Sequence, residues 1–88
     1  MKIAKRVTAG SLESSDVMVT LEPADSSELE LMVDSIVEKQ FGRRIREVAT
    51  EMLEKSGLSS GIVRIQDRGA LECTLRARIE TAIERLAS

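Results

Sequence analysis

The chain has 88 residues, of which 42% are hydrophobic and 32% charged, with a formal net charge of -2 and Phe41 as its only aromatic residue. This length and balance predict one small globular domain, residues 1–88, and argue against both a disordered chain and a nucleic-acid-binding protein. The single cysteine, Cys73, and the lack of histidine exclude an internal disulfide and a Cys/His zinc site, and no apolar run approaches the roughly 20 residues that span a bilayer, so we expect a cytoplasmic protein without a metal.

Two segments in the first half of the chain alternate between apolar and polar residues, as strands with one buried face do. They cover residues 16–22 and 28–34, and a weaker strand is expected within residues 5–12. Because residues 23–27 are rich in turn-forming residues, we expect the strands at 16–22 and 28–34 to pair as an antiparallel hairpin.

From Ile36 onward the apolar residues recur at helical spacing, which predicts a helix of about five turns. Ser35 followed by Glu38 fits a capping box at its start, and Gly57 suits a left-handed cap at its end. The expected apolar stripe of this helix consists of Val37, Phe41, Ile45, Val48, Met52 and Leu53.

A further short strand is predicted at residues 61–66, and residues 67–69 then turn the chain into a second helix. Since a strand, a helix and a strand follow one another, we expect the last strand to pair in parallel through a right-handed crossover. The expected fold class is α+β, a three- to four-stranded mixed sheet covered by two amphipathic helices. The stripe of the second helix consists of Leu71, Leu75, Ile79, Ile83 and Leu86.

Catalysis by this chain alone is not expected, and we assign no catalytic residue. Without histidine, serine-histidine and cysteine-histidine pairs cannot form. Glu28 and Glu30 share a strand face, but exposed acids on a strand are typical of solvation. Cys73, near the start of the second helix, is interpreted as a packing residue.

Arginines on the two predicted helices could bind phosphate groups. The alternative is that they form solvated helix faces bound to acids. Arg43 precedes Glu47 by four residues, and Glu72 precedes Arg76 by four, which is the spacing of helical ion pairs. The arginines in question are Arg43, Arg44, Arg46, Arg76 and Arg78.

The polar, turn-prone segment at residues 9–16 would hold the hydroxyls of Ser14 and Ser15 in solvent. Exposure of this kind is what covalent attachment of a group requires. The residues alone favour an ordinary hairpin turn, with Asp16 bonding to local backbone.

Three segments resemble those of the citrate lyase acyl carrier family, in the same order along the chain. The resemblance implies that Ser14 carries 2'-(5''-triphosphoribosyl)-3'-dephospho-CoA through a phosphodiester, installed by an external transferase. Family members often have glycine after the modified serine, where this chain has Ser15, so Ser15 is the alternative attachment site. The segments are Gly10-Ser11-Leu12-Glu13-Ser14-Ser15-Asp16-Val17, Glu38-Lys39-Gln40-Phe41-Gly42 and Gly69-Ala70-Leu71-Glu72-Cys73-Thr74-Leu75-Arg76-Ala77-Arg78.

The resemblance also implies partners and a cycle. In the family, the thiol of the arm carries an acetyl group, which an α subunit (acyl transferase) exchanges for citryl. A β subunit (lyase) then cleaves the citryl thioester to oxaloacetate and restores the acetyl thioester. The chain would be the non-catalytic γ subunit, because a tether that gives a high effective concentration at each active site needs no catalytic group of its own.

Three other interpretations remain open at this point. Asp34-Ser35-Ile36-Val37 is similar to the attachment motif of ordinary phosphopantetheine carriers, with Ser35 as the modified residue. Those carriers are helical bundles, so we interpret Ser35 as a helix cap instead. The carrier subunit of malonate decarboxylase uses the same kind of prosthetic group, and a cofactor-free protein-protein interaction module would have the same fold class.

Overall fold

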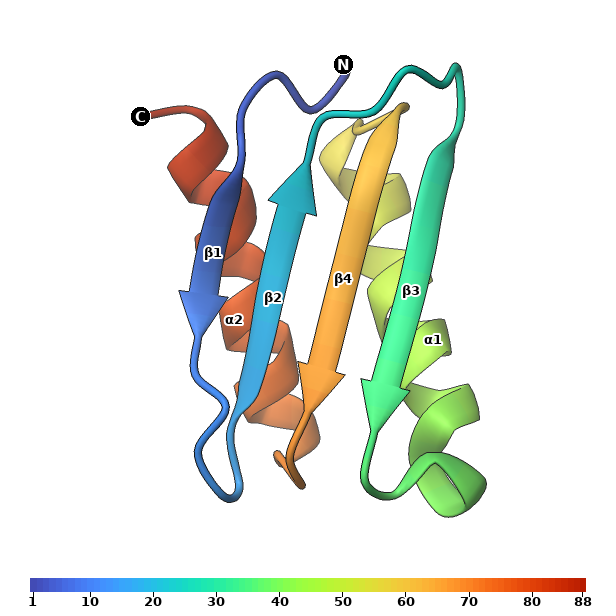
Figure 1. Ribbon diagram of the computed structural model, residues 1–88, viewed down its shortest axis with the longest axis vertical. Helices are drawn as coiled ribbons and strands as arrows, with labels where there is room; N and C mark the ends of the chain where they lie inside the picture. The colour runs from blue at the N-terminus through green and yellow to red at the C-terminus, as the bar shows by residue number, and fades with distance from the viewer.

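The computed structural model describes residues 1–88, apart from the side chain of Glu38, and it confirms the α+β fold class. Figure 1 shows the sheet as one layer and both helices behind it, on the same face. Every strand and helix lies where the apolar periodicity predicts it. In chain order the elements are β1 (Val7–Gly10), β2 (Val17–Glu22), β3 (Leu29–Ser35), α1 (Glu38–Ser56), β4 (Gly61–Asp67) and α2 (Glu72–Leu86).

The strands are arranged in the order β1-β2-β4-β3. β2 is antiparallel to β1 and to β4, while β3 is parallel to β4, as predicted for the last strand. The predicted hairpin of residues 16–22 with residues 28–34 is wrong, because β4 lies between β2 and β3 (Figure 1). The reason is burial. Every second residue of β4 is fully buried and so belongs in the middle of the sheet, whereas β3 has no fully buried residue and forms an edge.

The hydrophobic core is aliphatic and lies between the sheet and the two helices. Phe41 and Leu71, both expected in the apolar stripes, are instead 53% and 72% exposed. Both lie where their helices begin, at the end of the sheet, so neither reaches the core. The largest fully buried side chains are those of Val17, Val19, Leu21, Val48, Val63, Ile65 and Ile79.

The two ends of α1 differ from each other in how well the sequence predicts them. Gly57 has a φ of 81° and forms the left-handed cap that was expected. The capping box is wrong: Val37 is the N-cap residue, without a side-chain cap bond, and the side chain of Glu38 lies outside the described residues. Ser35 stays in β3 because it pairs there with Asp67, and its Oγ accepts a hydrogen bond from the Val37 amide at 3.1 Å.

Candidate functional site

The serine loop, residues 11–16, joins β1 to β2 at the end of the sheet where β3 and β4 also finish (Figure 1). Its base is tight. Gly10 has a φ of 87°, and a Cβ placed there would lie 1.9 Å from the Val17 carbonyl oxygen. Only glycine combines this conformation with so close an approach of two backbones, so Gly10 fixes the direction in which the chain leaves β1.

Asp16 organises the loop from within. Its Oδ2 accepts a hydrogen bond from Ser11 Oγ at 2.7 Å, and its Oδ1 accepts one from the Val17 amide at 2.7 Å. The prediction that Asp16 bonds local backbone is confirmed. Arg78 of α2 adds a bidentate contact, with Nε at 3.1 Å from Oδ1 and Nη2 at 3.3 Å from Oδ2.

These bonds stabilise the ionised form of Asp16. The hydrogen bond from Ser11, then those from the Val17 amide and Arg78, lower the pKa of Asp16 from its usual 3.8 to about 2. Its side chain is only 17% exposed, yet it keeps its negative charge at neutral pH. The carboxylate therefore ties the loop to α2.

A second tie connects the loop to the turn that follows β4. The Ser15 amide donates a hydrogen bond to the Arg68 carbonyl at 2.7 Å, and the Arg68 amide donates one to the Asp16 carbonyl at 2.9 Å. The loop thus bonds through its backbone to residues 67–70 and through a side chain to α2. These two ties restrict the movement of the loop and of the residues that it presents to solvent.

Ser14 and Ser15 are the two central residues of a turn, which the Asp16 amide closes by a hydrogen bond to the Glu13 carbonyl at 3.1 Å, and both are exposed as expected. Among the described residues, neither hydroxyl has a hydrogen-bond partner. Their backbones differ: Ser15 has a φ of 67°, the left-handed region that favours glycine, and it is the only non-glycine residue in the chain with a positive φ. Ser14 therefore presents an unoccupied hydroxyl from an unstrained backbone.

Ser35, the alternative attachment residue, lies in a different environment. It is half-buried, and its hydroxyl donates a hydrogen bond to Asp67 Oδ2 at 2.9 Å. Asp67 is itself buried, and it also accepts a hydrogen bond from the Ala70 amide. The four-stranded sheet also contradicts the all-helical fold that an ordinary phosphopantetheine carrier requires. Ser35 is thus a structural link between the ends of β3 and β4.

The helix arginines are mostly bound to acids. Arg44 Nε lies 2.6 Å from Glu72 Oε1, and Arg44 also contacts Glu47 at 3.3 Å, so α1 and α2 are linked. The predicted pair of Arg43 with Glu47 does not form, because Arg44 takes that acid. The predicted pair of Glu72 with Arg76 is confirmed, at 3.3 Å.

Cys73 is exposed, so its interpretation as a packing residue is wrong. It stands two residues before the buried Leu75, an offset of about 200° around a helix, and therefore points away from the core. Within the described residues, no group of three or more histidine, cysteine or acidic side chains is arranged to hold a metal ion. No described helix is long and apolar enough to cross a membrane.

Sequence reasoning missed the two residues that hold the loop. Arg78 had been noted only as a possible phosphate ligand, and Arg68 only as part of a turn. Asp16 and Arg78 are 62 positions apart, so no local pattern in the sequence indicates their contact. The only local indication of an ordered loop in the sequence is Asp16, an acid directly before a predicted strand.

The fold and the loop define a small α+β protein in which two helices cover one face of a mixed sheet and an exposed serine stands at one end. Residues 4–86 match the family model described as ACP, malonate decarboxylase delta subunit. The chain is 47% identical, over 99% of its length and 85% of the relative's, to a citrate lyase acyl carrier protein of Streptococcus mutans. The corresponding protein of Escherichia fergusonii is 49% identical over 99% of this chain and 90% of its own. The chain belongs to the citrate lyase acyl carrier protein family.

A solved structure shows the same fold at lower sequence similarity. It is the crystal structure of a Pseudomonas malonate decarboxylase hetero-tetramer in complex with malonate, and one of its chains matches with a TM-score of 0.82. The match has 24% sequence identity and covers 96% of this chain and 86% of that chain. At this identity the likeness concerns the fold alone.

Proposed function

We propose that this chain is the acyl carrier subunit of a cytoplasmic citrate lyase complex and that Ser14 is its attachment residue. The prosthetic group would be 2'-(5''-triphosphoribosyl)-3'-dephospho-CoA, joined to the Ser14 hydroxyl by a phosphodiester and installed by a separate transferase. The observation that carries the proposal is the Ser14 hydroxyl itself, which is exposed and without a partner on a loop that is bonded at both sides. The near full-length similarity to citrate lyase acyl carrier proteins supports it.

The residues around Ser14 suit a group joined through a phosphate. An open hydroxyl leaves room for the transferase to approach. Arg68 and Arg78 supply guanidinium groups at the same end of the molecule, and both remain partly exposed at 27% and 40%. Guanidinium groups of this kind can interact with a phosphate while they keep their carboxylate partners.

The backbone of Ser15 supports Ser14 as the attachment residue. The family often has glycine after the modified serine, and Ser15 has the left-handed conformation that glycine adopts most readily. With Ser14 as the modified serine, Ser15 would stand where the family often has glycine, and its left-handed backbone is one that suits glycine.

The division of labour in the proposal follows from what the chain contains. The arm supplies a terminal thiol that holds an acyl group as a thioester. Cleavage of citrate to oxaloacetate and acetate is assigned to the partner α subunit (acyl transferase) and β subunit (lyase). The carrier holds one end of the arm on a fixed loop, and tethering raises the effective concentration of the acyl group at each partner site.

Mass spectrometry of protein co-expressed with the transferase tests the proposal. The wild type and Ser15→Ala should gain the mass of the prosthetic group, and Ser14→Ala should not. Peptide mapping should place the increment on Ser14, and Ser14→Ala should abolish citrate cleavage by the reconstituted complex. An increment that persists in Ser14→Ala, or full cleavage activity in that variant, would show the assignment to be wrong.

The matching family model gives a reason to consider a second carrier role, in malonate decarboxylase. The attachment chemistry would be the same, so mass alone does not separate the two. Modified carrier should be combined in turn with the catalytic subunits of citrate lyase and of malonate decarboxylase. Turnover only with the malonate decarboxylase subunits would favour the second role.

A further inference from the structure

An apolar groove of about 400 Å³ lies between the first turns of α1 and α2. Its size falls within the range of small-molecule sites, at roughly 300 to 1,000 Å³. Polar groups from Arg44, Asp67 and Glu72 also line it. The apolar side chains that line it include Val37, Phe41, Ile45, Ala70, Leu71 and Leu75.

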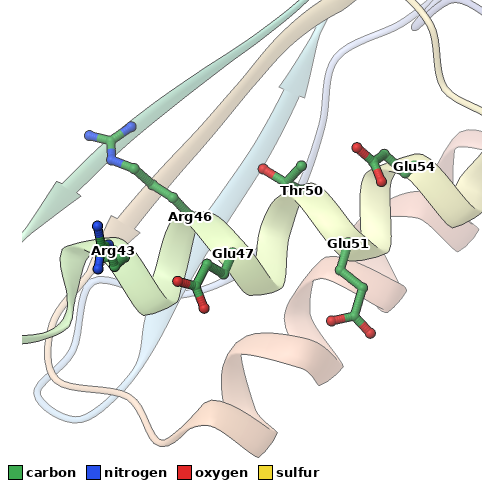
Figure 2. A pocket seen from close by; sticks show the side chains of 6 residues that line it. All are labelled: Arg43, Arg46, Glu47, Thr50, Glu51 and Glu54. Atoms are coloured by element: carbon green, nitrogen blue, oxygen red, sulfur yellow. The ribbon is translucent and has the colours of Figure 1, made fainter.

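Two other hollows differ from this groove in chemistry or position. One, of about 720 Å³, lies along an exposed face of α1, and the side chains that line it, shown in Figure 2, are charged or carry a hydroxyl. We expect water to occupy such a surface in preference to an apolar group. A smaller apolar hollow between Leu29 and Leu58 lies near the other end of α1, where the chain leaves that helix. Neither is suited to an apolar group tethered at Ser14.

The groove adjoins the serine loop through the turn after β4. Asp67 and Gly69 line the groove, and Arg68 between them is the residue whose backbone bonds to Ser15 and Asp16. Gly69 adds no side chain at this turn, and a Cβ there would meet only the Ile36 Cδ1, at 3.8 Å. The turn that bonds to the serine loop thus also lines the groove, so a flexible group attached to Ser14 would cross only this turn to enter it.

The rim of the groove consists of apolar side chains that are not buried in the core of the fold. Phe41 and Leu71 remain exposed on its two sides, although they occupy stripe positions of their helices. Exposed apolar surface beside a functional residue is a common sign of a binding site. The outer half of a CoA-type arm is a chain of methylene and methyl groups interrupted by two amides, which suits a mainly apolar groove with a few polar groups at its edge.

Resting on the proposed function, we propose that this groove holds the outer half of the carrier's own arm, including its acyl end, between transfers. The bound arm would be in equilibrium with a free, extended one, so the partner subunits would compete for it. Burial in the groove would remove water from the acyl thioester. The groove therefore gives the carrier a resting position for its cargo.

Nuclear magnetic resonance of apo and modified carrier is the first test. The modified sample is verified by mass beforehand. We expect shifts of the side-chain signals of Val37, Phe41, Leu71 and Leu75, in addition to those of the serine loop. Shifts confined to the loop in a sample that carries the arm overturn the groove proposal alone. Failure of the chain to gain the arm overturns the proposed function and the groove proposal with it.

The reactivity of the arm thiol is the second test. Cys73→Ser removes the only thiol of the chain itself, so that 5,5'-dithiobis(2-nitrobenzoate) reports on the arm. Phe41→Glu and Leu71→Glu, both on the rim, should speed the reaction about fivefold by releasing the arm. Met32→Glu, a change at an exposed residue on the other face of the sheet, should leave the rate unchanged. Equal rates in all four proteins would show that the arm does not rest there.

A partner protein is the other occupant to consider. If the groove signals shift only when the α or β subunit is added, and not on attachment of the arm, the groove is a partner surface. That result overturns the resting position. The two rim variants would then weaken assembly instead of changing thiol reactivity.

Discussion

Ser14, Ser15 and Asp16 are adjacent in the chain and have three different roles in the loop. Ser14 leaves its hydroxyl in solvent, Ser15 turns the backbone through a left-handed conformation, and Asp16 bonds the turn to α2. The exposure of the two serines follows from the polar, turn-prone sequence, and the structure confirms it. The conformation of Ser15 could not be predicted, because serine gives no local signal for a positive φ.

Substitution of Ser15 by glycine should stabilise the fold. The left-handed conformation costs a non-glycine residue about 1 to 2 kcal/mol, and glycine removes this cost. Part of the stabilisation is lost again because glycine has greater conformational freedom in the unfolded chain. We expect the free energy of unfolding, measured by urea denaturation, to rise by up to about 1 kcal/mol. Ser14→Gly is the matched control and should lower it slightly. A loss of stability in Ser15→Gly would contradict the strain described at this residue.

The lowered pKa of Asp16 predicts a dependence of stability on pH. In the unfolded chain the carboxyl titrates near its usual 3.8, and in the folded protein at about 2. The stabilisation is therefore complete above the unfolded pKa and is lost as the pH falls through the folded one. Asp16→Asn should be less stable than the wild type at neutral pH, and the difference should shrink between pH 4 and pH 2, values that bracket the two pKa values.

Urea denaturation at several pH values measures that difference, and an NMR titration of the Asp16 carboxyl gives its pKa directly. Glu13→Gln, in the same loop, is the control, since the carboxylate of Glu13 accepts no hydrogen bond from the described residues. A constant gap between Asp16→Asn and the wild type across this pH range would contradict the lowered pKa.

At the scale of elements, the sequence predicts what each segment forms better than which neighbour it takes. Alternation identifies the strands and the face that each buries, as in β2, where Val17, Val19 and Leu21 point into the core. It contains no information on strand order, and the turn residues between β2 and β3 suggested a hairpin that the structure does not form. β4 takes the central position because its core-facing residues are buried throughout. Strand order depends on how deeply each of the strands is buried relative to the others, and the alternation within one segment does not show this.

The turn from β1 into the serine loop gives a prediction at this scale. Gly10→Ala should lower the free energy of unfolding by about 2 kcal/mol or more, because its Cβ would collide with the Val17 carbonyl. Gly57→Ala is a matched control with a similar φ of 81° and no atom within 4 Å of the added Cβ, and it should cost only about 1 kcal/mol. Attachment of the arm should slow in Gly10→Ala alone. Equal effects of the two changes would contradict the tight base of the loop.

The two ends of the molecule differ: one, the functional end, holds the proposed attachment serine, and at the other the N-terminus closes the fold. The serine loop, the turn after β4 and the starts of both helices meet at the first end (Figure 1). At the other, the amino group of Met1 donates hydrogen bonds to the Gly57 carbonyl and to Ser59 Oγ, which fastens the N-terminus to the end of α1. If Ser14 carries the arm, as proposed, we expect partner subunits to bind near the first end.

The position of Arg43 allows this polarity to be tested. Arg43 lies in the second turn of α1, near the functional end; it is exposed, and its side chain makes no ion pair among the described residues. Because a charge reversal there breaks no ion pair of the described residues, a change in binding should come from a partner. We expect Arg43→Glu to weaken binding of the carrier to the other subunits about fivefold at low salt, and less at high salt. Isothermal titration calorimetry at two salt concentrations measures both.

Lys55→Glu makes the same change of charge in the last turn of α1, at the opposite end of the molecule. It removes only an exposed contact with Glu51, so folding should be almost unaffected. Arg76 is unsuitable for this comparison because it bonds Glu72 and Glu51 within the fold. If Arg43→Glu and Lys55→Glu bind equally well, the partners do not use the surface beside the serine loop. If only Lys55→Glu loses affinity, the functional end has been assigned to the wrong end of the molecule.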